Sequence, residues 1–191
     1  MANDLSRFEL NVDKAVLVVI DVQERLVPAM PQDIYLALRS SVDMLVKAAK
    51  LLGIPVVTTE QYPKGIGHTV SELAHACEDG VIEKVSFGCC GEPSFLDALK
   101  KIGRSQVIVT GMEAHVCVYQ TVLGLLGDGY HVHLVRDAIC SRNKTDYLAG
   151  VENASQARAV VTTVETVLFQ LLQESTHEHF RAISKLVKER S

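Results

Sequence analysis

Gln106-Val-Ile-Val-Thr-Gly-Met-Glu-Ala-His-Val-Cys117-Val118 is the stretch that decides the fold. An apolar run over Gln106–Thr110 ends at Gly111, and a helical pattern begins a few residues later. A strand that leads so quickly into a helix places Cys117 in the first turn of that helix. Backbone N–H groups are unpaired there and the helix dipole is positive. We therefore expect a stabilised thiolate, which would make Cys117 a nucleophile.

The rest of the chain repeats the same alternation of strand and helix. Apolar, β-branched runs occur at Ala15–Ile20, Ile54–Thr58, Val81–Val85, Gln106–Thr110, His131–Val135 and Ala159–Thr163. Helical patterns occur at Asp33–Leu52, Thr69–Cys77, Ser94–Ile102, Val116–Gly127, Thr145–Asn153 and Thr163–Leu172. Several runs are continuously apolar, which is typical of strands covered on both faces. The pattern predicts a three-layer α/β/α fold, with a Rossmann-like, doubly wound parallel sheet between two layers of helices.

The length of 191 residues suits one domain, and no repeat or linker divides the chain. We expect residues 1–191 to form a single domain, with a core at about 13–172 and a C-terminal helical tail at 173–191. Phe180, Ile183 and Leu186 would form the apolar side of a last helix. The tail would dock either on its own domain or on another subunit, and the sequence leaves both possibilities open.

Composition excludes several classes of protein. A net charge of −4 gives no general attraction to nucleic acid or to anionic membranes. The sequence has neither a membrane-spanning apolar stretch nor a secretory or transit leader. Its five cysteines are odd in number and irregularly spaced, which indicates neither a disulfide framework nor structural zinc. We expect an intracellular, cytoplasmic protein in a reducing compartment.

Three chemically useful side chains follow three of the predicted strands. Asp21 comes directly after the first strand, Lys84 lies at the end of the third and Cys117 follows the fourth. Ligands of open α/β sheets bind outside the carboxyl ends of the strands, so all three would meet at one rim. Each also has a plainer interpretation, as a capping carboxylate, a solvated charge and a small core side chain. Their convergence favours a catalytic site.

These motifs together resemble the isochorismatase-like cysteine hydrolase family, over about residues 13–172. They read Val18-Val-Ile-Asp21-Val-Gln23, Glu83-Lys84 and Thr110-Gly111, followed by Val116-Cys117-Val118. The resemblance implies a six-stranded parallel sheet in the order 3-2-1-4-5-6 and an Asp-Lys-Cys triad of Asp21, Lys84 and Cys117. It also implies a cis peptide between Met112 and Glu113, which would direct the N–H groups of Glu113 and Cys117 at an oxyanion.

The triad suggests a covalent mechanism in which Asp21 takes the proton of Cys117 and Lys84 offsets the negative charge. The thiol is typical of the amidohydrolase branch of the family, so we expect hydrolysis of a C–N bond in a small molecule, through a thioester-type intermediate. Nicotinamidases of this family hold a metal with an Asp-x-His pair. Here Glu60 and Tyr62 occupy those positions. Since tyrosine is a poor ligand at neutral pH, we predict no metal and no cofactor.

Four further residues follow strand ends and are candidates for the substrate pocket, namely Gln23, Tyr62, Phe87 and His115. Each is equally compatible with ordinary packing or a loop position.

The vicinal pair Cys89-Cys90 is expected to be either inert or redox-sensitive. Alternative functions are cleavage of another small ester or ether-like substrate, a non-catalytic binding or scaffold role, and redox sensing. Like other members of the family, the chain is expected to form a homo-oligomer.

Overall fold

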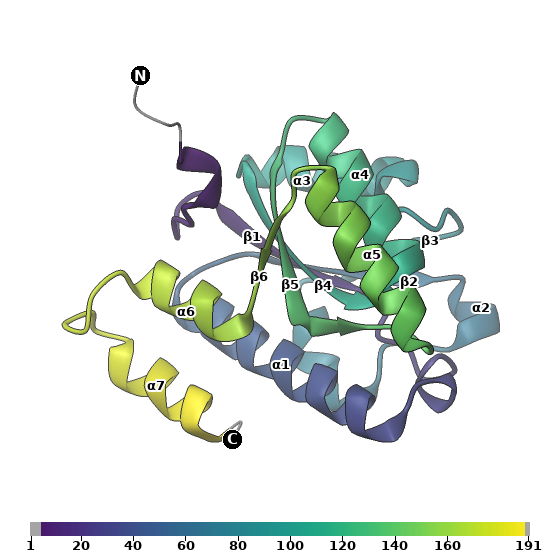
Figure 1. Ribbon diagram of the computed structural model, residues 1–191, viewed down its shortest axis with the longest axis horizontal. Coiled ribbons are helices and arrows are strands. Elements are labelled where there is room, and N and C mark those ends of the chain that lie inside the picture. The colour runs from purple at the N-terminus through teal and green to yellow at the C-terminus, as the bar shows by residue number, and fades with distance from the viewer. Residues whose placement is uncertain (1–4, 190–191) are drawn as a thin grey trace.

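The computed structural model describes residues 5–189, and a six-stranded parallel sheet lies at its centre (Figure 1). The strand order is β3-β2-β1-β4-β5-β6, as the resemblance implied. The strands are β1 (Ala15–Ile20), β2 (Val56–Gln61), β3 (Val81–Lys84), β4 (Gln106–Met112), β5 (His131–Cys140) and β6 (Val160–Thr162). Strand order reverses between β1 and β4, so the carboxyl ends of these strands flank the point where such folds bind ligands.

Helices cover both faces of this sheet, which confirms the predicted three-layer fold. They are α1 (Gln32–Leu51), α2 (Pro63–Ile66), α3 (Pro93–Ile102), α4 (Tyr119–Gly127), α5 (Lys144–Gln156), α6 (Val164–Leu172) and α7 (Phe180–Glu189). Short 3-10 segments span Ser6–Phe8, Val27–Ala29, Ser71–Cys77 and Cys89–Gly91, and a π-helical turn spans Ala114–Val118.

Strand β1 shows why its sequence is apolar throughout. Its side chains alternate between two hydrophobic clusters, with Leu17 and Val19 in one and Val16 and Val18 in the other. The first cluster lies under α1, α6 and α7, and the second lies under α3, α4 and α5. Both faces are therefore dry, and a period-two pattern is absent because neither face meets water.

Three element predictions need correction. The strand expected at Ile54–Thr58 is β2, which runs on to Gln61, and β5 continues to Cys140 instead of ending at Val135. The helix expected at Thr69–Cys77 is a 3-10 segment with a kink at Leu73. Both strand extensions contain polar residues. Because polar residues after an apolar run are typical of loops, the sequence pattern predicted that these strands end too early.

The C-terminal helix α7 packs on its own chain, against α1 and α6. Ile183 is fully buried, and the rings of Phe169 and Phe180 lie 6.3 Å apart. Of the two possibilities left open by the sequence, the structure shows docking on the same domain. Across residues 5–189, none of the helices combines the length and apolar character needed to cross a membrane.

Candidate active site

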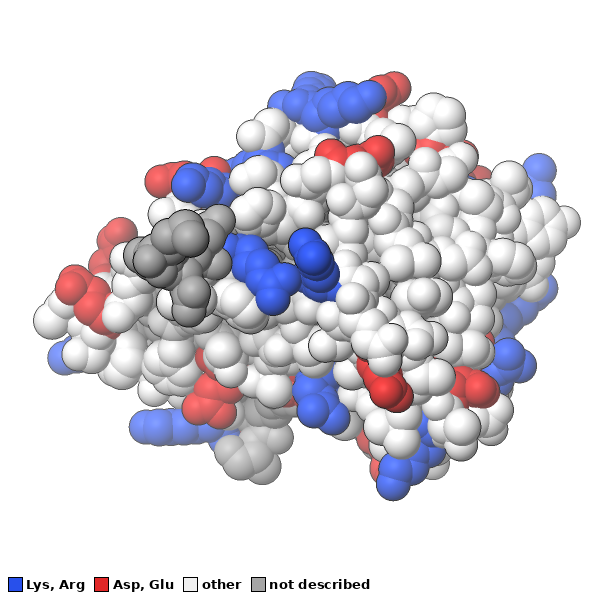
Figure 2. Space-filling model, turned by 45° about the horizontal axis from the view of Figure 1, so that its top comes forward, with Lys and Arg blue, Asp and Glu red and all other residues white. Residues whose placement is uncertain are grey.

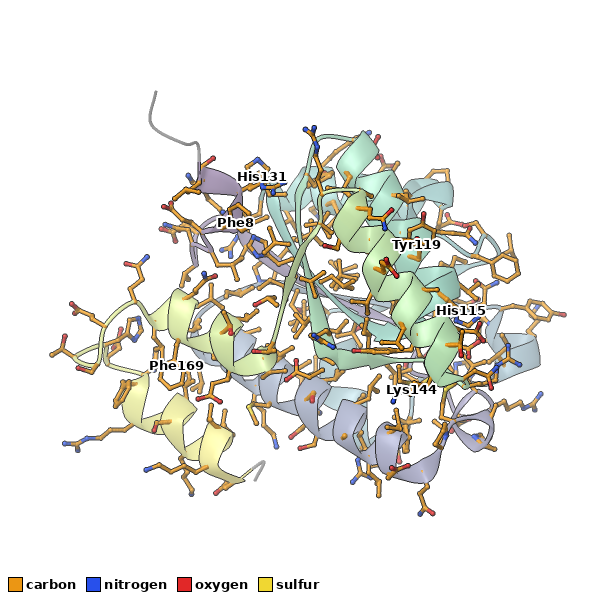
Figure 3. The ribbon with its side chains drawn as sticks, in the orientation of Figure 1. Phe8, His115, Tyr119, His131, Lys144 and Phe169 are labelled. Carbon is orange, nitrogen blue, oxygen red and sulfur yellow. The ribbon has the colours of Figure 1, made fainter. Side chains whose placement is uncertain are left out.

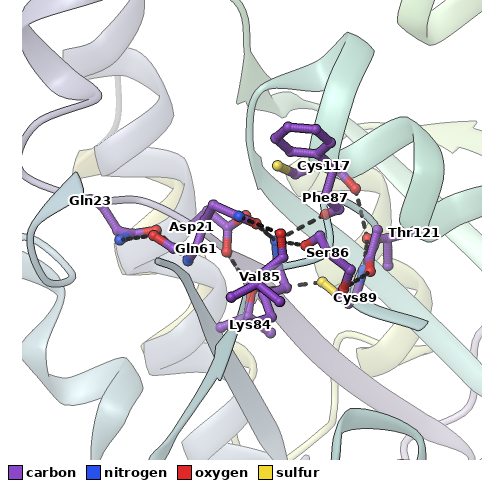
Figure 4. A network of polar contacts seen from close by, with 12 residues as sticks. Asp21, Gln23, Gln61, Lys84, Val85, Ser86, Phe87, Cys89, Cys117 and Thr121 are labelled. Atoms are coloured by element: carbon purple, nitrogen blue, oxygen red, sulfur yellow. Dashed lines mark hydrogen bonds and ion pairs between the residues drawn. The ribbon is translucent and has the colours of Figure 1, made fainter. Parts of the chain in front are cut away.

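Asp21, Lys84 and Cys117 come together at the carboxyl edge of the sheet (Figure 4). Lys84 Nζ lies 2.6 Å from Asp21 Oδ2, and neither side chain is exposed. Cys117 is 6% exposed, and the Asp21 carboxylate acts on its thiol both by charge and as a hydrogen-bonding partner. A buried ion pair facing a cysteine is an arrangement suited to nucleophilic catalysis.

The Lys84 ammonium is held by oxygen atoms on several sides. Besides Asp21, it donates to Gln61 Oε1 at 2.8 Å and to the carbonyls of Ser86 and Phe87 at 3.2 and 2.9 Å. These acceptors replace the water that burial removes, because an unpaired buried charge would be costly. The ammonium is thereby fixed at one position beside the carboxylate.

Asp21 is equally constrained. Its Oδ1 accepts from the hydroxyl of Thr59 at 2.8 Å while its Oδ2 accepts from Lys84. Its backbone lies in the left-handed region with φ of 51°, which aspartate tolerates better than most residues. With both oxygens occupied by donors, the carboxylate has a single orientation.

Cys117 lies in the π-helical turn Ala114–Val118, immediately before α4. The Glu113 carbonyl accepts from the N–H groups of both Val116 and Val118, so the turn widens around the cysteine. The Cys117 carbonyl accepts from Thr121 Oγ1 at 2.6 Å, and the same hydroxyl accepts from the N–H of Cys89 at 2.9 Å. Thr121 thus ties the cysteine to the loop that carries Lys84's acceptors.

The expected resting thiolate is wrong. Burial, followed by the negative charge of Asp21, raises the pKa of Cys117 to about 12, whereas Lys84 acts in the opposite direction. Desolvation outweighs the helix dipole because the sulfur lies inside the protein beside a carboxylate. Burial also raises the pKa of Cys89 to about 11 and that of Cys140 to about 12. The same two charges also act on Cys89, so Cys117 is distinguished by its partial exposure and its position before α4, and not by a low pKa.

The peptide bond between Met112 and Glu113 is cis. The Glu113 side chain contacts Arg142, whose backbone N–H and Nε both donate to Glu113 Oε1, at 3.1 and 3.0 Å. Gly111 precedes this turn with φ of 113°, and a Cβ there would overlap the backbone of Ile20. The glycine is needed because β1 and β4 approach closely at this point.

The four predicted pocket residues occupy different surroundings. Gln23 is fully buried, and its amide bonds to the backbone of Gln61 and Gly67. His115 contacts Ser141 Oγ through Nδ1 at 3.0 Å and lies near Asp146, at the start of α5 (Figure 3). Tyr62 and Phe87 are exposed at the rim, and Tyr62 lines a cavity of about 310 Å³ beside Lys84. Of the four, these two have the most exposed side chains.

Glu60 contacts His68 at the position where the resemblance placed a metal in nicotinamidases. Glu60 Oε2 lies 2.9 Å from His68 Nδ1, and Glu60 Oε1 accepts from the N–H and the hydroxyl of Thr69. Both carboxylate oxygens are therefore engaged within the protein. Among residues 5–189, no group of three or more His, Cys, Asp or Glu side chains is arranged to hold a metal ion.

Sequence reasoning missed Thr59, Gln61 and Thr121, which form hydrogen bonds with the three candidate catalytic residues. Thr59 and Gln61 lie two residues apart on β2, so they point to the same face of the sheet. Polar residues at alternate positions of a strand end were the available signal. The prediction that this strand ended at Thr58 concealed it.

The comparisons with known proteins agree with this architecture. The isochorismatase domain family matches residues 15–166, and the chain belongs to this family. Isochorismatase family protein 1A of Dictyostelium discoideum is 38% identical over 152 residues, which cover 76% of this chain and 73% of that protein. Isochorismatase domain-containing protein 2 of Danio rerio is 38% identical over 181 residues, covering 93% and 89%.

Solved structures show the same fold. One described as a MAR1 ribonuclease from Caenorhabditis elegans has a TM-score of 0.88 and 37% identity, covering 94% of this chain and 92% of that chain. The YcaC gene product of Escherichia coli, described as an octameric hydrolase of unknown specificity, has a TM-score of 0.85 and 22% identity, covering 99% and 98%. At that identity the second likeness concerns the fold alone.

Proposed function

We propose that the chain is a cysteine hydrolase that cleaves a C–N bond in a small molecule without a metal or other cofactor. The observation that carries the proposal is the buried Lys84–Asp21 pair, 2.6 Å apart, facing the thiol of Cys117. A structural ion pair would not require a partly exposed cysteine at its open side, and of the two cysteines near these charges Cys117 is 6% exposed whereas Cys89 is fully buried.

The raised pKa of Cys117 determines how the first step proceeds. Because burial and the charge of Asp21 raise the pKa of this thiol, attack from a preformed thiolate is disfavoured at neutral pH. Asp21 instead removes the proton as the sulfur attacks the carbonyl carbon. Lys84 donates to this carboxylate at 2.6 Å, and its ammonium stays beside Asp21 after the proton has been transferred.

The remaining steps balance without any further reactant except water. The S–C bond forms, the proton taken by Asp21 passes to the leaving nitrogen, and the C–N bond breaks to give a thioester. Asp21 then takes a proton from water as the water oxygen attacks the thioester carbon. The C–S bond breaks, the proton returns to the sulfur, and the carboxylic acid leaves. The N–H groups of Glu113 and Cys117 would stabilise the two oxyanions, each worth roughly 3–4 kcal/mol.

A small substrate fits the surroundings of the sulfur. Cys117 is 6% exposed, while Tyr62, Val85 and Phe87 are exposed around the buried pair. A substrate covering these apolar side chains would exclude water from the reacting atoms.

Beyond this substrate class, our proposal includes a single domain, assembly into a homo-oligomer and a cytoplasmic location. One relative, from Phytophthora sojae, is described as a secreted isochorismatase effector.

RNA is the other substrate class to consider, because the C. elegans structure is described as a ribonuclease. The charges of this chain favour a small molecule. Its net charge is −4, and Figure 2 shows blue and red side chains interspersed over one face, with broad uncharged areas between them. A nucleic-acid site is ordinarily recognised by a continuous basic surface.

Acyl-enzyme mass spectrometry tests the proposal. The protein, purified without a histidine tag and treated with chelator, is incubated with small amides, ureides, esters and a short RNA. We expect an adduct on the peptide that contains Cys117, with turnover of an amide or ureide. Cys117→Ala should abolish both, whereas the control Cys77→Ala should keep both. Hydrolysis that survives Cys117→Ala, or cleavage of RNA alone, would refute the proposed function.

A further inference from the structure

We propose that a second cavity, separate from the candidate active site, binds a small amphipathic carboxylate. The cavity has a volume of about 520 Å³ and lies between the first turns of α1, the end of β5 and the first turns of α5. This volume is in the range of natural small-molecule sites. Cys117, Asp21 and Lys84 are not among the residues that line it.

The lining is apolar on the inside. Leu38 and Ile139 are buried, while Ile34 on α1 and Leu148 on α5 are 45% and 47% exposed. Side chains of this size are usually covered when they gather at one place. The apolar part of a ligand would remove them from water at roughly 25 cal/mol per Å².

Three cations line the same cavity, namely Arg136, Arg142 and Lys144. Arg142 is committed to Glu113, 3.0 Å away. Neither Arg136 nor Lys144 forms an ion pair within the described part of the chain. The one acidic lining residue, Asp137, accepts from the N–H of Val164 at the start of α6. The local charge is thus positive, and two of the cations have capacity for an anion.

Helix geometry adds to this positive field. Lys144 is the first residue of α5, and Figure 3 shows it in the space between that helix and α1. Helix α1 begins at Gln32, directly after the lining residue Pro31. The N-termini of α1 and α5 thus lie at the cavity that the three cations line, although cations near helix N-termini are unfavourable. A bound carboxylate would relieve this repulsion, which is why we assign an anion with an apolar body.

Binding is tested with octanoate, octanol and octylamine by calorimetry. The protein carries carbamidomethylated Cys117, so that the candidate active site is blocked. We expect octanoate to bind at least tenfold more tightly than the other two probes. Arg136→Gln combined with Lys144→Gln should weaken octanoate binding about tenfold, because both cations would lose their ion pair with the carboxylate. The control, Lys100→Gln with Lys101→Gln on α3, removes the same charge elsewhere and should leave affinity unchanged.

Three results would overturn the assignment. One is the absence of octanoate binding, and another is equal binding of octanol. The third is an octanoate affinity that the Arg136/Lys144 double variant leaves intact. Leu148→Asp, on the exposed side of the cavity, adds a sedimentation measurement. If this change dissociates an oligomer while octanoate does not bind, the face is an interface between copies of this chain, and the ligand site is refuted. None of these outcomes depends on the hydrolase proposal.

Discussion

His133 is a buried histidine whose protonation should make the protein sensitive to mild acid. It lies in β5, is fully buried, and neither ring nitrogen has a hydrogen-bond partner in the described structure. Burial, with a smaller effect of His131, lowers the pKa of His133 from 6.5 to about 4. The unfolded chain therefore binds more protons than the native protein between pH 6.5 and 4, and stability must fall as the pH falls through this window.

The size of the effect follows from the two pKa values. Their difference corresponds to about 3 kcal/mol once the pH is below both. At pH 5 the unfolded histidine is nearly all protonated and the native one is mostly neutral, so about 2 kcal/mol is already lost. His133→Leu removes the titrating group and its unpaired nitrogens. We expect the variant to lack this loss, and to be at least as stable as the parent at pH 7.5 because it leaves no buried polar atom unpaired.

Urea denaturation at pH 7.5 and pH 5 measures the difference directly. The parent should lose about 2 kcal/mol more than His133→Leu on acidification. Other titrating groups are common to both proteins and cancel in the comparison. His179→Gln, which removes a histidine outside the sheet, should behave like the parent. If parent and His133→Leu lose stability in parallel, His133 is already protonated or partnered in the native state, and the reasoning fails.

Four other changes test the candidate site and the turn that leads to it. Asp21→Asn should speed alkylation of Cys117 by iodoacetamide at fixed pH, and Lys84→Met should slow it, because the carboxylate raises and the ammonium lowers the pKa of the thiol. Both changes should abolish hydrolysis. Each should also lower the free energy of unfolding by about 3–5 kcal/mol, because a buried charge loses its partner. Alkylation rates that move in the same direction in the two variants would contradict this electrostatic account, with circular dichroism checking that each variant folds. Thr121→Val should lower the free energy of unfolding by about 1–3 kcal/mol, because the buried N–H of Cys89 loses its acceptor. Thermal unfolding, together with the kinetics of Cys117 alkylation, measures this effect. Gly111→Ala should prevent stable folding, because its Cβ would overlap the backbone of Ile20. The control Gly127→Ala, where a Cβ meets nothing within 4 Å, should be tolerated. Soluble yield and unfolding temperature compare the two variants, and an unaffected Gly111→Ala would show that β1 and β4 can move apart.

The alternating pattern of apolar runs and helical stripes determined the architecture. Strands buried on both faces must be apolar at every position, as Ala15–Ile20 is, and helices between them must carry one apolar stripe. Because parallel strands end at one edge, Asp21, Lys84 and Cys117 could be placed together before any coordinates were known. Local chemistry and chain order were sufficient for that much.

Only the tertiary structure decided how those side chains behave. The proton stays on Cys117 because burial and the charge of Asp21 act together, and neither is visible in the helix-start pattern that favoured a thiolate. Thr59 and Gln61 lie on β2 and Thr121 lies in α4, so their hydrogen bonds to Asp21, to Lys84 and to the backbone of Cys117 depend on how these elements pack. The docking of α7 on α1 and α6, and the cationic cavity between α1 and α5, likewise arise from surfaces that are far apart in the chain. Electrostatics and solvation depend on three-dimensional neighbours, and periodicity along a sequence carries little information about them.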